Sequence, residues 1–122
     1  MLATGIDLVQ VRRIEEALTQ YGERFLARVF TLGERAYCGT RAPQLAARFA
    51  AKEAVSKALG VGIQHRDGVG WREIEIVANA RGQPAIQLFG RAAARAAELG
   101  IAHFSISLSH TREHAIAMVV AE

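Results

Sequence analysis

The sequence predicts an α+β fold in which a mostly antiparallel sheet packs against one long central helix and several short helices. Three observations support this prediction. Residues 71–78 and 103–110 alternate apolar with polar side chains, as half-buried strands do. A turn sequence at residues 79–82 joins the first of these segments to another strand-like one, which indicates an antiparallel hairpin. Between Pro43 and Gly60 the chain carries helix-forming residues with a start signal and a stop signal at the two ends.

The first predicted element is a strand over residues 4–9, where small or polar side chains alternate with branched apolar ones, as in a strand with one buried face. Asp7 lies late in this strand, and aspartate is poorly suited to strands. Asp7 therefore needs a partner, such as a cation, a cluster of backbone N–H groups or an arginine, unless it caps the following helix.

Three short helices are predicted next: residues 11–21, 23–30 and 31–37. Thr31 and Glu34 have the spacing of a capping box at the start of the third helix. In the second helix, Arg24 and Arg28 are one turn apart, and like charges at this spacing repel each other. We therefore expect this arginine pair to meet an acidic partner.

The central helix has two different sides. Its alanines at positions 47, 51, 54 and 58 fall in one narrow stripe that lets another backbone approach closely. On the opposite side, Arg48, Lys52 and Ser56 share a face with apolar residues, so the helix is not cleanly amphipathic. The only two lysines of the chain, Lys52 and Lys57, both lie here. Because a compact ammonium group suits phosphate oxygens, we expect a functional site on this helix, the alternative being a solvated Glu53–Lys57 pair.

Beyond the central helix, glycines bracket a loop over residues 60–70, for which mobility is the expected property. The hairpin over residues 71–88 follows, and then an alanine-rich helix over residues 91–99 and a strand over residues 103–110. Residues 115–120 are almost wholly apolar, which is typical of a strand that is central or buried on both faces.

Length and composition favour a single domain over residues 1–122, because 122 residues with 51% hydrophobic side chains support one modest core. The net charge of +3 favours acidic partners such as phosphates, acidic proteins or nucleic acid. Cys38 is the only cysteine, which excludes an internal disulfide and fits a reducing compartment. Asp7 interrupts the N-terminus before a secretory signal forms, and no uncharged run approaches the ~20 residues of a membrane span. We therefore expect a cytoplasmic protein without membrane contact.

Three pieces of the chain together have the chemistry of a magnesium–diphosphate site. Asp7 and Glu53 supply hard oxygen ligands for the cation, and Lys57 offsets the remaining phosphate charge. His110, with hydroxyl-bearing neighbours on both sides, can hold a second phosphate at a hairpin. Each piece also has a structural alternative, since a histidine in a turn is often simply solvated.

In this order, the pieces resemble the 4′-phosphopantetheinyl transferases, in particular the small bacterial type, the holo-(acyl-carrier-protein) synthases. The resemblance covers nearly the whole chain. It is carried by five motifs: Gly5-Ile6-Asp7, residues 48–60 with the sequence RFAAKEAVSKALG, Trp71-Arg72-Glu73-Ile74-Glu75-Ile76, Gly82-Gln83-Pro84 and Ser107-Leu108-Ser109-His110.

The resemblance implies the transferase fold, a magnesium ion and coenzyme A as co-substrate. Asp7 and Glu53 would bind Mg²⁺ with the diphosphate of coenzyme A, and Lys57 would contact the same phosphates. Further coenzyme A-binding residues are implied: Arg48, Phe49, Gly60, Ser109, His110 and Thr111. The reaction would move 4′-phosphopantetheine to a serine of an acyl carrier protein for fatty acid biosynthesis, releasing adenosine 3′,5′-bisphosphate. Glu53 or a water on the metal would act as base, and these alternatives stay open.

The resemblance also implies a homotrimer with active sites between subunits. This agrees with helix geometry, because Arg48 lies about 140° around the central helix from Glu53, too far for one ligand to meet both easily from one subunit. Carrier proteins are acidic, so Arg13 and Arg24 are expected to bind the acceptor. Carrier domains of polyketide or peptide synthesis are an alternative acceptor. A basic nucleic-acid-binding module is disfavoured, because aromatic residues make up only 7% of the chain and mostly occupy apolar-periodic positions.

Overall fold

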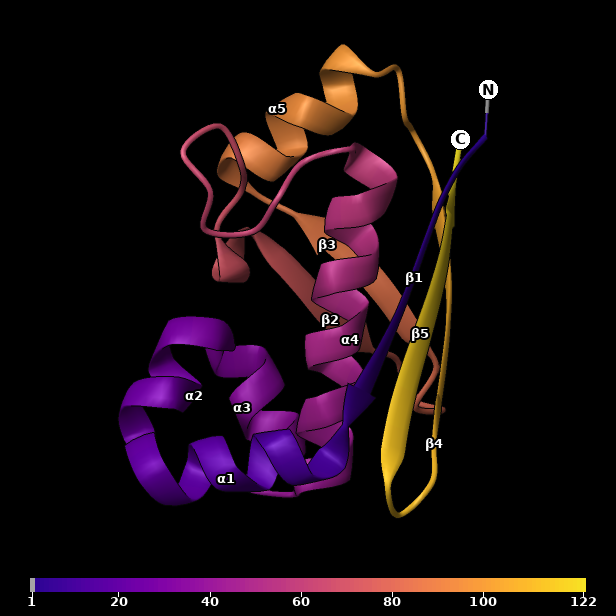
Figure 1. Cartoon of the computed structure of the whole chain (residues 1–122). Coiled ribbons are helices and arrows are strands. Elements are labelled where there is room, and N and C mark those ends of the chain that lie inside the picture. The colour runs from indigo at the N-terminus through magenta and orange to yellow at the C-terminus, as the bar shows by residue number, and fades with distance from the viewer. Residues whose placement is uncertain (1) are drawn as a thin grey trace.

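A long helix, α4 (Ala42–Leu59), lies at the centre of the fold, with a three-stranded sheet along one side and the other elements around it (Figure 1). The computed structural model describes residues 2–122 and has the predicted α+β architecture. The other elements are, in chain order, β1 (Ala3–Gln10), α1 (Val11–Tyr21), α2 (Glu23–Val29), α3 (Leu32–Cys38), the 3₁₀ helix η1 (Trp71–Glu73), β2 (Ile74–Ala78), β3 (Pro84–Leu88), α5 (Gly90–Glu98), β4 (Phe104–His110) and β5 (His114–Ala121).

The strands form two antiparallel sheets. The larger sheet has the order β1–β5–β4, and Ala117 of β5 lies opposite both Asp7 of β1 and Leu108 of β4. Strands β2 and β3 form a separate hairpin. The prediction of antiparallel strands packed against a long helix is therefore confirmed.

Strand β5 is central, as predicted, and one of its faces is buried. The side chains of its inner face are wholly buried in the core: Ala115, Ala117, Val119 and Ala121. On the outer face, Ile116 and Met118 are 36% and 47% exposed. The apolar residues of β5 therefore line the core on one face of the strand and are exposed at the surface on the other.

Strand β1 packs very closely on α4. A Cβ atom added at Gly5 would lie 1.8 Å from the carbonyl oxygen of Ala54 and 3.1 Å from the backbone nitrogen of Ala58. Both alanines belong to the predicted stripe, so the prediction that this stripe admits another backbone is confirmed. Because β1 turns its small residues toward α4, Ile6 and Leu8 face outward and are 56% and 61% exposed.

The helix ends follow the local signals. Pro43 lies in the first turn of α4, and Gly60 ends the helix in the left-handed conformation with φ of 70°. The predicted capping box of Thr31 and Glu34 is present at α3. The first strand of the hairpin begins three residues later than predicted, because Trp71 and its two successors form η1. Within residues 2–122, none of the helices combines the length and apolar character needed to cross a membrane.

Candidate active site

Asp7 lies in the middle of β1, on the face that packs against α4. Its Oδ1 atom lies 3.1 Å from Nζ of Lys57, which also donates a 2.9 Å hydrogen bond to the carbonyl oxygen of Ile6. The prediction that Asp7 needs a partner is confirmed, and a lysine of α4 is the partner. The alternative that Asp7 caps the following helix is wrong, because β1 continues to Gln10, which is the N-cap residue of α1.

Glu53 lies one turn before Lys57 on α4 and is half-buried. Burial and the negative charge of Asp7 raise the pKa of Glu53 above its ordinary value. Three positive groups oppose this rise: Lys57, Arg13 and His65. Asp7, Glu53 and Lys57, which we call the carboxylate–lysine cluster, therefore lie together as predicted, and the two carboxylates attract a further cation.

The carboxylate–lysine cluster fits a magnesium ion. Mg²⁺ prefers oxygen ligands and usually takes one or two carboxylates, leaving its other positions to water and substrate phosphates. In residues 2–122, no group of three or more His, Cys, Asp or Glu side chains could hold a metal ion. The residues present therefore suit a metal ion that is shared with substrate oxygens better than one enclosed by protein ligands.

Two hollows on the surface share the side chains of Phe25 and Phe49. Arg13, whose charge acts on Glu53, lines a pocket of about 110 Å³ together with Phe25 and Phe49. The same two phenylalanines also line a larger groove of about 430 Å³. We call this larger hollow the aromatic groove, and its residues are Tyr21, Arg24, Phe25, Arg28, Val29, Phe49 and Trp71.

The aromatic groove combines an apolar wall with two arginines. Phe49 of α4 packs on Trp71 of η1, with ring centroids 4.7 Å apart and an interplanar angle of 33°. Arg24 and Arg28 line the same groove, and neither forms an ion pair within residues 2–122. The groove therefore offers apolar surface and positive charge to a partner from outside the chain.

Arg48 lies apart from the carboxylate–lysine cluster. Its guanidinium stacks over the ring of Tyr37 at 4.4 Å, and the residue is only 6% exposed. Its Nε atom has no hydrogen-bond partner within residues 2–122. A buried donor without an acceptor is costly, so this position calls for an acceptor from a ligand or another chain.

The predicted phosphate-binding residues 109–111 lie at the end of β4 and the start of the turn to β5, and all three are exposed. The hydroxyl of Thr111 accepts hydrogen bonds of 3.2 and 3.1 Å from the backbone N–H groups of residues 113 and 114, which shapes the turn. No hydrogen bond or ion pair in the described chain joins this turn or Arg48 to the carboxylate–lysine cluster. Within the described chain, no direct polar contact therefore links these two groups of predicted site residues.

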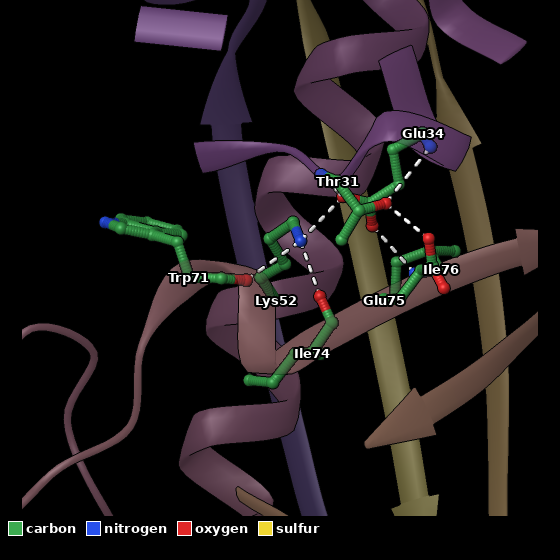
Figure 2. Close-up of polar contacts among 7 residues, drawn as sticks. All are labelled: Thr31, Glu34, Lys52, Trp71, Ile74, Glu75 and Ile76. Carbon is green, nitrogen blue, oxygen red and sulfur yellow. Dashed lines mark hydrogen bonds and ion pairs between the residues drawn. The ribbon is translucent and has the colours of Figure 1, made fainter. Parts of the chain in front are cut away.

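Lys52 does not belong to the site. Its side chain is fully buried, and its Nζ lies 2.8 Å from Oε1 of Glu34 (Figure 2). The expectation that both lysines of α4 suit phosphate is therefore wrong for Lys52, because its charge is already paired inside the protein. Sequence reasoning assigned Glu34 only a capping role, although a lysine on a mixed apolar face signals a buried carboxylate partner.

Sequence reasoning also missed most of the aromatic groove. The sequence places most aromatic residues at apolar-periodic positions and Trp71 at the start of a strand, which does not indicate a shared groove. One signal was present in the sequence, because Phe25 lies between Arg24 and Arg28 on one helix. An aromatic residue beside unpaired arginines is typical of a binding surface.

Residues 3–119 match the family model of the 4′-phosphopantetheinyl transferase superfamily. The chain belongs to this superfamily. Relatives in this superfamily that match the chain over nearly their whole length are identical to it at about half of the aligned positions. A holo-[acyl-carrier-protein] synthase of Herpetosiphon aurantiacus is 49% identical, with 98% of each chain covered. One from Dehalococcoides mccartyi is 51% identical, covering 100% of this chain and 99% of the relative.

Solved structures of phosphopantetheinyl transferases have the same fold. The chain resembles the Helicobacter pylori holo-[acyl-carrier-protein] synthase in complex with coenzyme A, with 34% identity, a TM-score of 0.87 and coverage of 98% of this chain and 99% of that one. The Neisseria meningitidis enzyme gives 34% identity, a TM-score of 0.86 and coverage of 98% and 97%. The family resemblance and the predicted transferase fold are therefore confirmed.

Proposed function

We propose that this chain transfers 4′-phosphopantetheine from coenzyme A to a serine hydroxyl of apo acyl carrier protein, releasing adenosine 3′,5′-bisphosphate. The observation that carries the proposal is the carboxylate–lysine cluster in a chain that is similar over its full length to holo-[acyl-carrier-protein] synthases. The single free thiol of Cys38 fits a reducing compartment, and we propose the cytoplasm as the location.

Asp7 and Glu53 are the residues that would hold Mg²⁺ together with the diphosphate of coenzyme A. The metal ion would supply charge neutralisation of the diphosphate as its bond breaks. Lys57 has two roles in this arrangement: its ammonium group holds the Asp7 carboxylate at 3.1 Å, and its half-exposed end adds positive charge for the phosphates.

The transfer is an in-line phosphoryl transfer, so positioning and charge neutralisation supply most of the rate. The serine oxygen forms a bond to the phosphorus next to pantetheine, and the bond from that phosphorus to the adenosine 3′,5′-bisphosphate oxygen breaks. Glu53 is one candidate for accepting the serine proton, because it is a carboxylate of the carboxylate–lysine cluster, and a water on the metal is the alternative.

The acceptor protein would bind along Arg13 and the aromatic groove. Arg13 lines the smaller pocket and its charge acts on Glu53. Arg24 and Arg28 line the aromatic groove and have no ion-pair partner in residues 2–122. An acidic carrier protein complements these charges, and Phe25 and Phe49 offer apolar contacts between them.

We further propose a homotrimer in which a neighbour completes each coenzyme A site with Arg48 and residues 109–111, while Gly60, directly after α4, contributes beside the cluster and Phe49 serves the acceptor through the aromatic groove. Two observations support association. The outer face of the β1–β5–β4 sheet exposes a row of apolar side chains: Ile6, Leu8, Ile116 and Met118. The buried Nε of Arg48 lacks an acceptor in the described chain. A second copy of the chain would cover the apolar row, and a ligand bound between the two copies would supply an acceptor for Nε of Arg48.

Mass spectrometry of an apo acyl carrier protein, incubated with the chain, coenzyme A and Mg²⁺, tests the proposal. We expect a mass gain of one phosphopantetheine group, absent when coenzyme A or the chain is omitted. A gain only on carrier domains of polyketide or peptide synthesis would change the acceptor and keep the chemistry. No gain on any apo carrier would refute the function.

A further inference from the structure

A buried polar network joins four elements next to the aromatic groove (Figure 2). The ammonium group of Lys52 on α4 contacts Oε1 of Glu34 on α3 at 2.8 Å. It also donates to the carbonyl oxygen of Trp71 in η1 at 2.9 Å and to that of Ile74 in β2. Neither charged side chain has any exposed surface, so solvent does not weaken these contacts.

The geometry indicates that both groups are charged. Three acceptors surround Nζ of Lys52, and only a protonated ammonium group offers three N–H donors. Burial lowers the pKa of Lys52, and the carboxylate of Glu34 opposes that shift. Glu34 in turn accepts hydrogen bonds from the backbone N–H groups of Thr31 at 2.9 Å and of Ile76 at 2.7 Å, so both of its carboxylate oxygens have donors.

This network reaches the aromatic groove through Trp71. The backbone carbonyl of Trp71 is held by Lys52, and its ring packs on Phe49 with centroids 4.7 Å apart. Phe49 lies three residues before Lys52 and four before Glu53 on the same helix. Lys52 therefore links the wall of the groove to the helix that carries the carboxylate–lysine cluster.

We infer that Glu34 and Lys52 form a positioning pair for the acceptor protein: they hold Trp71 against Phe49 and thereby set the shape of the aromatic groove. The inference rests on the proposed function, because the groove is where the carrier protein is proposed to bind. Neither residue touches the substrates. Loss of the pair therefore affects the KM for the carrier protein far more than the KM for coenzyme A.

The test replaces both partners together, since removing one alone leaves an unpaired buried charge. The double variant E34L/K52M fills a similar volume with apolar side chains. Trp71 is the only tryptophan of the chain, so its fluorescence reports the position of this ring directly. V119A is the matched control, because it opens a cavity in the core at β5, away from the groove.

We expect acrylamide quenching of Trp71 in the double variant to rise clearly and the carrier KM to rise about tenfold, as for loss of an aromatic anchor. The KM for coenzyme A and the kcat stay close to wild type. V119A lowers the melting temperature and leaves quenching and both KM values unchanged. A folded double variant with wild-type quenching and carrier KM would overturn the inference, as would a V119A protein that shows the same two changes.

A milder variant keeps the test decisive should the double variant not fold. E34D retains the charge and withdraws the carboxylate by one methylene, so we expect smaller increases in Trp71 quenching and in carrier KM. The absence of both increases would contradict the inference. If the wild-type chain modifies no carrier protein, the proposed function and the acceptor part of the inference fail, whereas Trp71 quenching still decides whether the pair positions the ring.

Discussion

The substitution Gly5→Ala tests how closely β1 must approach α4. The new Cβ would lie 1.8 Å from the carbonyl oxygen and 2.8 Å from the carbonyl carbon of Ala54, where ordinary contacts begin at 3.4 Å. Strand and helix would therefore have to separate by roughly 1.6 Å, since backbone atoms cannot rotate away as a side chain does. Overpacking typically costs about 1–3 kcal/mol, and for a clash with backbone we expect a loss of about 3 kcal/mol in the free energy of unfolding.

Urea unfolding at fixed subunit concentration, followed by circular dichroism, measures this loss. Phosphopantetheine transfer is assayed in parallel, and we expect a marked fall because Asp7 lies two residues farther along the displaced strand. Gly39→Ala is the control for backbone strain without a clash: its Cβ meets nothing within 4 Å, and its φ of 57° with ψ of −126° opposes the change by about 1–3 kcal/mol, with transfer activity kept. A Gly5→Ala protein as stable and as active as wild type would refute the close approach of β1 to α4.

Three further predictions concern the site. Glu53→Gln removes transfer activity, and without Mg²⁺ it raises the free energy of unfolding at pH 7. The raised pKa of Glu53 means that its contribution to stability falls as pH rises from the ordinary pKa of 4.5 through the folded-state pKa, and glutamine does not titrate. Equal unfolding midpoints of variant and wild type from pH 3 to pH 7, or retained activity, would contradict this. Arg13→Glu raises the carrier KM strongly at low salt and little at high salt, and the KM for coenzyme A stays near wild type. The control Arg12→Glu, at a side chain that is 86% exposed, changes the carrier KM less, and equal effects of the two substitutions would argue against a specific role of Arg13. Mixing inactive Glu53→Ala subunits with inactive His110→Ala subunits restores part of the activity if neighbours share sites, and mixtures that stay inactive despite proven exchange would exclude the shared site.

Local signals predicted the elements well. Pro43 and Gly60 marked α4, and Thr31 with Glu34 marked the start of α3, because caps and turns depend on a few neighbouring residues. The need of Asp7 for a partner could also be anticipated, since a carboxylate in a strand requires one, although the strand itself does not indicate that Lys57 is that partner. These are features whose causes lie within a few residues of the feature itself.

Features that join distant segments were harder to predict. Alternation in residues 4–9 shows that β1 has two different faces, but it does not show which one meets the core. The structure buries the glycine side, because the alanine stripe of α4 leaves room only for backbone, and exposes Ile6 and Leu8. The Glu34–Lys52 pair was missed for a similar reason: each residue has a plausible local role, and only the fold brings them to 2.8 Å.

The roles assigned to single residues of the site stay predictions, as does the single domain over residues 1–122. The structure assembles Asp7, Glu53 and Lys57 within one chain, and it leaves Arg48 and residues 109–111 apart from them. The subunit-mixing experiment is the direct test of how these two groups combine.

The pairing of β1 with β5 has a consequence for how the protein is made. Asp7 at the start of the chain lies opposite Ala117 near its end, and Figure 1 shows the first and last strands side by side. During translation, β1 therefore has no strand partner until β5 has been synthesised and has emerged from the ribosome. Contacts between such distant residues form slowly, because closing the long loop between them costs conformational entropy before the contacts compensate for it. The sheet that holds Asp7 on its inner face is therefore completed only after translation has passed the last strand.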